Sequence, residues 1–122
     1  MKLLIVDDHA ECRAMAARLL AVLGHDVVEA GDAATAEAIL HREGSINLVL
    51  LDLFLGETDG VDLADRLEAE RPGLRVLFMS GHGEDTCDLD LADLTGPRRQ
   101  FLEKPFSFPA LEAALESLAH RT

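Results

Sequence analysis

The sequence predicts an α/β fold in which helices cover both faces of an open parallel sheet. Short apolar runs alternate with segments whose apolar residues recur at helical spacing. The runs are continuously apolar, which is typical of strands that are buried on both faces. With 122 residues, of which 48% are apolar, the chain has the size and composition of a single domain spanning residues 1–122.

The first part of the chain predicts two strands and two helices. An apolar run at 3–6 gives the first strand, and Gly24 is placed to end the helix that follows it. A short second strand centres on 27–28. Asp32 can then cap a second helix, which Gly44 ends. The predicted inward face of the first helix consists of Cys12, Met15, Ala16, Leu19, Leu20 and Leu23.

The middle of the chain continues the alternation. The apolar run at 46–51 is the clearest strand pattern in the sequence, and a loop at 53–59 follows it. A third helix begins at Gly60 and is stopped by the Pro-Gly pair at 72–73. A fourth strand then occupies 74–79.

The C-terminal part predicts a fifth strand at 101–102 and a last helix with Ser107 as its N-cap. Residues 84–99 carry mixed strand and helix patterns, and we assign a short helix there. The alternation of strands and helices favours right-handed crossovers between parallel strands.

The net charge of the chain excludes some classes of binding partner. Eleven Lys and Arg residues against 23 Asp and Glu residues give a net charge of −12. Because such a surface repels phosphates and anionic lipids, nucleic acid and membrane are not expected partners. No apolar run approaches the ~20 residues that span a bilayer. With no secretion signal and only two cysteines, the cytoplasm is the expected compartment.

Polar residues stand at the carboxyl ends of four predicted strands. Asp7 and Asp8 follow the first strand, and Asp52 follows the third. Ser80 ends the fourth strand, and Lys104 follows the fifth. Ligands of open α/β sheets bind at this edge, where the strand order reverses. If the first and third strands are neighbours, as in the flavodoxin-like order 2-1-3-4-5, the three carboxylates meet in one crevice.

Three close carboxylates favour a proton or a cation among them. Hard oxygen donors without a His or Cys pattern favour Mg²⁺ over zinc. A carboxylate beside Mg²⁺ can act as a nucleophile toward phosphorus. Ser80 could then donate to one phosphoryl oxygen, while Lys104 neutralises another.

Four segments carry a resemblance to a known family. They are LLIVDD at 3–8, LVLLD at 48–52, VLFMSG at 76–81 and FLEKPF at 101–106. In this order they resemble the CheY-like receiver domain of response regulators, the phosphoacceptor module of two-component signalling, over essentially the whole chain. Receivers are among the known examples of the strand order given above, so that order is not an independent prediction.

The resemblance implies a chemical role for each matching residue. Asp52 would accept a phosphoryl group from a phosphohistidine on a sensor histidine kinase or a histidine phosphotransfer protein. Asp8 and Asp52 would bind Mg²⁺ directly and Asp7 through water, with the backbone carbonyl of Phe54 as a further ligand. Lys104 would contact the phosphoryl group. Such a domain assists its own phosphorylation and dephosphorylation and is not an enzyme in the ordinary sense.

The resemblance also implies a switch. Ser80 would be the switch hydroxyl and Phe101 the switch aromatic residue. The Lys104–Pro105 peptide bond would be cis. Phosphorylation would change the face made by the fourth helix, the fifth strand and the fifth helix, and this face would bind an unknown downstream protein.

Three departures from the family pattern lie close to these residues. Leu55 and Gly56 stand where the family often has Met-Pro, so we expect a looser loop. Gly81 replaces a common alanine and should leave the site more open. Phe101 has no hydroxyl and can report the switch only through its burial.

Other functions remain as alternatives. A phosphohydrolase with an aspartyl nucleophile typically has a second acid two residues later, where this chain has the apolar Phe54. A nucleotide or flavin binder should have a Gly-rich or Ser/Thr-rich loop after the first strand, where this chain has acids. A receiver-like interaction module that is never phosphorylated is the third alternative.

The start of the chain at the first strand suggests a stand-alone regulator. The sequence around Ser80 and Lys104 also resembles receivers attached to hybrid histidine kinases.

Overall fold

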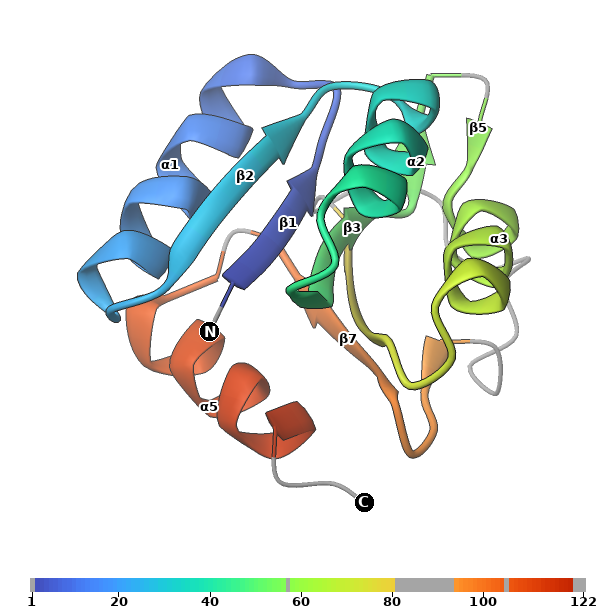
Figure 1. The fold of residues 1–122 in the computed structure, drawn as a ribbon. Helices are drawn as coiled ribbons and strands as arrows, with labels where there is room; N and C mark the ends of the chain where they lie inside the picture. Colours follow the sequence, from blue (N-terminus) through green and yellow to red (C-terminus); the bar gives the residue numbers. More distant parts are fainter. Residues whose placement is uncertain (1, 57, 81–93, 105, 120–122) are drawn as a thin grey trace.

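The computed structural model describes residues 2–56, 58–80, 94–104 and 106–119. Its centre is a five-stranded sheet in the order β2-β1-β3-β6-β7, with all neighbouring strands parallel (Figure 1). The strands are β1 (Lys2–Val6), β2 (Asp26–Ala30), β3 (Ile46–Asp52), β6 (Arg75–Ser80) and β7 (Arg99–Glu103). The predicted order is confirmed, with β6 and β7 as the fourth and fifth strands of this sheet.

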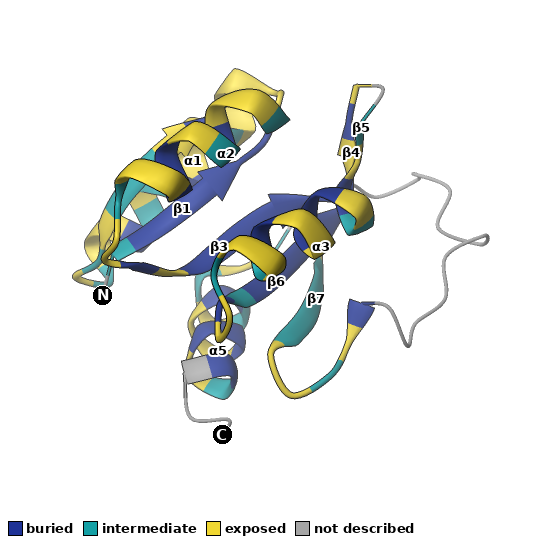
Figure 2. Ribbon diagram, turned by 45° about the vertical axis from the view of Figure 1, so that its right-hand side comes forward, coloured by how far each residue is buried: buried dark blue, intermediate teal, exposed yellow. Residues whose placement is uncertain are grey.

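Helices cover both faces of the sheet and bury a separate apolar layer on each. The helices are α1 (Ala10–Val22), α2 (Ala33–Arg42), α3 (Gly60–Glu70) and α5 (Phe108–Ala119). Alternate residues of one strand serve the two layers: Leu4 packs with α2 and α3, whereas Leu3 packs with α1 and α5. Figure 2 shows the buried strands lying between these helices. The continuous apolar runs of the sequence therefore reflect burial on both sides.

Local capping interactions place the helix ends. The Asp32 carboxylate accepts a hydrogen bond from the backbone N–H of Thr35 at 2.7 Å, as an N-cap does. Ser107 accepts from Ala110 N at 3.2 Å, so the predicted cap of the last helix is confirmed. Gly24 follows the end of α1 with a φ of 92°, a backbone conformation that favours glycine.

The inward face of α1 is narrower than predicted. Cys12 is exposed, and the exposed fraction of Met15 is 65%, so their assignment to the core was wrong. The helix packs through Ala16 and Leu20, with Leu19 and Leu23 partly buried beside them. Cys12 lies in the first turn, next to the loop at the carboxyl edge, and Met15 lies on the margin of the buried stripe.

The predicted loop at 53–59 contains a small antiparallel ribbon. Its strands are β4 (Phe54–Leu55) and β5 (Thr58–Asp59). Gly56 lies in the connection with a φ of 60°. The segment with Leu55 and Gly56 in place of Met-Pro thus lies at a paired ribbon, and the expectation of a looser loop stays a prediction.

Part of the predicted helix within 84–99 lies outside the described residues. Of its described part, Leu94 is helical and buried, residues 95–98 are not helical, and Arg99 already belongs to β7. Gly81 and Pro105 also lie outside the described residues, so the expectations for Gly81 and for the Lys104–Pro105 bond stay predictions. Within the described ranges, no helix combines the length and the apolar character that crossing a membrane requires.

Candidate functional site

Three carboxylates meet at the carboxyl edge of the sheet. Asp52 is the last residue of β3, and Asp7 and Asp8 follow the neighbouring strand β1. One carboxylate oxygen from each of the three lies within 4.8 Å of the others. Asp7 and Asp52 are buried, whereas Asp8 is exposed. The convergence that the strand ends predict is therefore present in the structure.

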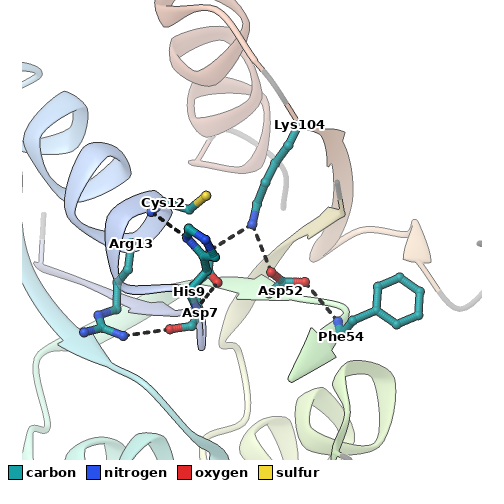
Figure 3. A network of polar contacts seen from close by, with 7 residues as sticks. All are labelled: Asp7, His9, Cys12, Arg13, Asp52, Phe54 and Lys104. Carbon is teal, nitrogen blue, oxygen red and sulfur yellow. Dashed lines mark hydrogen bonds and ion pairs between the residues drawn. The ribbon is translucent and has the colours of Figure 1, made fainter. Parts of the chain in front are cut away.

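A single ammonium group bridges the two buried carboxylates. Lys104 Nζ lies 2.8 Å from Asp7 Oδ2 and 2.9 Å from Asp52 Oδ2 (Figure 3). Lys104 directly follows β7, and its backbone N–H donates to the carbonyl of Ser80 at 2.7 Å. The lysine thus reaches from the edge strand across β6 to the centre of the sheet.

Backbone N–H groups hold the second oxygen of each buried carboxylate. His9 N donates to Asp7 Oδ1 at 2.9 Å, and Phe54 N donates to Asp52 Oδ1 at 2.9 Å. The turn after Asp52 is itself fixed, because Leu53 N donates to the carbonyl of Met79 at 2.8 Å. These contacts orient both carboxylates toward the same small region at the sheet edge.

Burial and charge act in opposite directions on the ionisation of this cluster. Burial raises the pKa of Asp52, and this outweighs the lowering by the Phe54 N–H and the Lys104 ammonium. Burial alone would lower the pKa of Lys104, but the hydrogen bonds and charges of Asp7 and Asp52 raise it overall. Lys104 is therefore charged at neutral pH, and the cluster carries an excess of negative charge.

Ser80 and Phe101 lie beside the acidic cluster on the next two strands. Met79 is the register partner of Asp52, so Ser80 extends one residue beyond it at the end of β6, with 2% of its surface exposed. Phe101 is half-buried in β7 and pairs with Phe78, below the edge. The structure therefore groups Asp7, Asp8, Asp52, Ser80 and Lys104 at the edge and places Phe101 behind them.

Phe54 lies on the outer side of the site. Its side chain is 37% exposed in β4, and its backbone N–H binds Asp52. The predicted role of its backbone carbonyl as a metal ligand stays a prediction.

The donor set suits a hard divalent cation. The three acidic groups supply only carboxylate oxygens, the ligand type that Mg²⁺ prefers. Of the three acids, Asp8 is the exposed one, whereas both oxygens of the buried Asp52 already accept hydrogen bonds from described residues. A cation held there would offset the negative charge that Lys104 leaves uncompensated.

Two residues near the site were missed by the sequence reasoning. Arg13 donates from Nη1 to the backbone carbonyl of Asp7 at 2.9 Å. Gly60 packs so closely on the turn after Asp52 that an added Cβ would lie 2.8 Å from the Asp52 carbonyl oxygen. Nothing in the sequence reveals either contact, because Arg13 and Gly60 both approach backbone atoms.

The fold and site together define an α/β domain with an acidic cluster at the switch point of a five-stranded parallel sheet. The family model described as "Response regulator receiver domain" matches residues 3–116. The chain therefore belongs to the response regulator receiver family, and the family resemblance in the sequence is confirmed. Phosphoacceptor function in two-component signalling is the function of this family and is supported for this chain.

Individual relatives agree with this assignment. The probable transcriptional regulatory protein TcrX of Mycobacterium tuberculosis is 32% identical over 98% of this chain and 50% of its own length. The phosphate regulon regulatory protein PhoB of Pseudomonas aeruginosa is 32% identical over 98% of this chain and 52% of its own length. The chain thus spans about half the length of these relatives.

A solved structure matches the chain over nearly its full length. The crystal structure of the receiver domain of NtrX from Brucella abortus superposes with a TM-score of 0.82 at 30% identity. The match covers 97% of this chain and 98% of that domain.

Proposed function

We propose that Asp52 is the phosphoacceptor of this receiver and that Mg²⁺ bound by the acidic cluster supports the transfer. The observation that carries the proposal is the position of the Asp52 carboxylate. It hydrogen-bonds Lys104, lies within 4.8 Å of oxygens of Asp7 and Asp8, and stands one strand from Ser80. Asp7 lies one strand further from Ser80, and Asp8 is exposed.

The chemistry follows from the charges around Asp52. A carboxylate oxygen of Asp52 attacks phosphorus, the bond from phosphorus to the donor histidine nitrogen breaks, and the imidazole leaves with that electron pair. Bound Mg²⁺ supplies charge neutralisation for the phosphoryl oxygens. Asp8 and Asp52 would hold the ion directly, with Asp7 through water and the Phe54 carbonyl as a further ligand. Lys104 then contacts one phosphoryl oxygen, and Ser80 donates to another.

The phosphoryl group on Asp52 would change the conformation of the residues around it. Phosphorylation adds negative charge and three acceptor oxygens at Asp52. Ser80 moves toward these oxygens, and Phe101 occupies the space that opens behind it. Since a population shift requires different contacts in the two states, Ser80 and Lys104 are the residues that supply them. The responding surface would be the face that includes β7 and α5.

The donor would be a sensor histidine kinase or a histidine phosphotransfer protein, as the relation to transcriptional response regulators indicates. The chain takes part in its own phosphorylation and holds the product, so it acts as a regulator and not as an enzyme with turnover. The exposed free Cys12 suits a reducing compartment such as the cytoplasm.

Mass spectrometry of the intact protein tests the acceptor. Incubation with acetyl phosphate and Mg²⁺ should add one phosphoryl group to the wild type and none to Asp52→Asn. Asp59→Asn, which changes an exposed aspartate at the end of β5, is the matched control and should still be modified. An adduct that persists in Asp52→Asn would refute Asp52 as the acceptor, and a wild type that is never modified would favour the alternative of an unphosphorylated interaction module.

A further inference from the structure

Asp8 is the one predicted metal ligand whose own side chain nothing holds in place within the described part of the chain. Its carboxylate is exposed and has no hydrogen bond to a described residue. Asp7 and Asp52, in contrast, each receive a backbone N–H and the Lys104 ammonium. The direction in which Asp8 points therefore depends on the backbone that carries it.

That backbone is held by Arg13. The carbonyl of Asp7 belongs to the peptide bond that joins Asp7 to Asp8, and it lies beyond the last residue of β1. Arg13 Nη1 donates to this carbonyl at 2.9 Å (Figure 3). The N–H of Asp7 donates to Ala30 on the neighbouring strand at 3.2 Å. The bond to Ala30 holds the preceding Val6–Asp7 peptide, and the bond from Arg13 holds the peptide plane between the two acids.

The guanidinium is itself anchored on β2. Arg13 Nε lies 3.2 Å from Glu29 Oε1, and only 23% of the arginine side chain is exposed. Gly31 leaves room for it, because a Cβ at that position would lie 3.1 Å from Arg13 Nη1. The planar, forked guanidinium binds the carbonyl and the carboxylate at once, which a lysine ammonium at the same position would not reproduce.

We propose that Arg13 is a positioning residue for the metal site: it fixes the Asp7–Asp8 peptide so that Asp8 faces Asp52, and thereby sets the affinity for Mg²⁺. Glu29 and Gly31 support this arrangement. The inference rests on the proposed function, since it assumes that the acidic cluster binds Mg²⁺. Groups that orient metal ligands typically contribute 10- to 100-fold to metal affinity, so Arg13→Ala should raise the Kd for Mg²⁺ about tenfold.

The direction in which the Kd for Mg²⁺ changes distinguishes a positioning role of Arg13 from a purely electrostatic one. Removal of a cation near an acidic site strengthens the attraction for Mg²⁺, so a purely electrostatic role predicts tighter binding in Arg13→Ala. Positioning predicts weaker binding. Arg18→Ala is the matched control, because Arg18 is exposed on the same helix and has no hydrogen bond or ion pair to the described residues of the site. It removes the same charge and should leave the Kd nearly unchanged.

The decisive experiment is calorimetric titration of the metal-free chain with Mg²⁺. Gly31→Ala should raise the Kd in the wild-type background and have no effect in Arg13→Ala, since the guanidinium that the new Cβ would approach is then gone. Glu29→Ala leaves Arg13 intact but untethered and should give a smaller rise. If Arg13→Ala does not fold, Glu29→Ala tests the positioning role in its place. In acetyl phosphate assays, Arg13→Ala should shift the Mg²⁺ concentration for half-maximal rate without lowering the plateau.

The outcomes separate the two proposals. If the wild type binds Mg²⁺ and Arg13→Ala binds it equally well or more tightly, the positioning role is overturned while the proposed function stands. Additive effects of Gly31→Ala and Arg13→Ala would likewise overturn it. A wild type that binds no Mg²⁺ would overturn the proposed function and this inference with it. A merely structural Arg13 would lower the stability of the metal-free chain without moving the Kd.

Discussion

Lys104 has an unusual position for a cation on so acidic a protein, because it is enclosed by the carboxylates that a metal would share. Its side chain is 18% exposed, against 1% for Asp7 and 6% for Asp52. In the metal-free state this lysine is the main compensation for two buried negative charges. It also repels any metal cation that binds beside it. Lys104 therefore favours the metal-free fold and opposes metal binding at the same time.

Lys104→Met should separate these two effects. Removing one partner of a buried ion pair leaves uncompensated charge, so we expect the free energy of unfolding in EDTA to fall by about 3 kcal/mol. The affinity for Mg²⁺ should rise, because the competing ammonium is gone. Urea unfolding and titration with Mg²⁺ measure the two quantities.

A matched control for Lys104→Met is Lys2→Met. Lys2 pairs with Glu43 at 3.0 Å, but the two side chains are 28% and 34% exposed. Solvent screens such a pair, so the free energy of unfolding should change by less than about 1 kcal/mol. Equal losses in both variants would show that the buried position of Lys104 has no special effect.

Asp52 should make stability depend on pH in a characteristic direction. Burial raises its pKa in the folded state above the ordinary value of 3.8. Its contribution to stability is therefore greatest below that value and is lost as the pH rises through the folded-state pKa. In metal-free buffer, Asp52→Asn should be more stable than the wild type at neutral pH, and this advantage should shrink as the pH falls.

Unfolding curves over a pH series check this prediction, with Asp26→Asn as a control for an exposed aspartate on β2. The same raised pKa implies that protons compete with Mg²⁺ at Asp52 at a higher pH than they would at an ordinary aspartate. A stability difference between wild type and Asp52→Asn that grows on acidification would contradict the assignment of burial as the dominant cause.

At the scale of elements, the start of α3 packs directly on the turn that follows Asp52. A Cβ at Gly60 would lie 2.7 Å from Leu53 Cα and 2.8 Å from the Asp52 carbonyl oxygen, both of them backbone atoms. Gly60→Ala should therefore displace the turn or the helix and lower the free energy of unfolding by about 2 kcal/mol. Because Phe54 N binds Asp52 within this turn, phosphorylation by acetyl phosphate should also slow.

Gly44→Ala is the control for this substitution. An added Cβ there has nothing within 4 Å, and Gly44 does not have a positive φ. We expect no loss of stability and no change in phosphorylation rate. If Gly60→Ala behaves like Gly44→Ala, the close packing of α3 does not position the acceptor.

Some features of the helices and strands could be predicted from the sequence, and others could not. The parallel order and the meeting of Asp7, Asp8 and Asp52 could be predicted, since strand ends are local patterns and parallel strands share one carboxyl edge. The β4–β5 ribbon could not, because strands of two residues have no readable period. The exposure of Met15 depends on how far α1 overlaps the sheet, which only tertiary packing decides.

Long-range arginine contacts form a second class that the sequence does not reveal. Arg71 donates to the carbonyls of Leu40, Glu43 and Ile46 at 2.6–2.9 Å and so connects the ends of α3, α2 and β3. Arg13 holds the Asp7 carbonyl in a similar way. In both cases the acceptor is a backbone group, which carries no residue-specific signal in the sequence.

At the scale of the whole molecule, a chain of net charge −12 should respond to any divalent cation, so specific binding must be distinguished from general screening. A ligand that binds only the folded state stabilises it by mass action, by about 2.7 kcal/mol at a hundredfold excess over Kd. Mg²⁺ should therefore raise the Tm of the wild type with a logarithmic dependence on concentration. Asp8→Asn should lose most of this gain, whereas Glu116→Gln, an exposed acid on α5 with the same change in charge, should keep it. Thermal unfolding at constant ionic strength measures the difference. Equal Mg²⁺ responses in the two variants would mean that screening of the whole surface, and not the acidic cluster, accounts for the stabilisation.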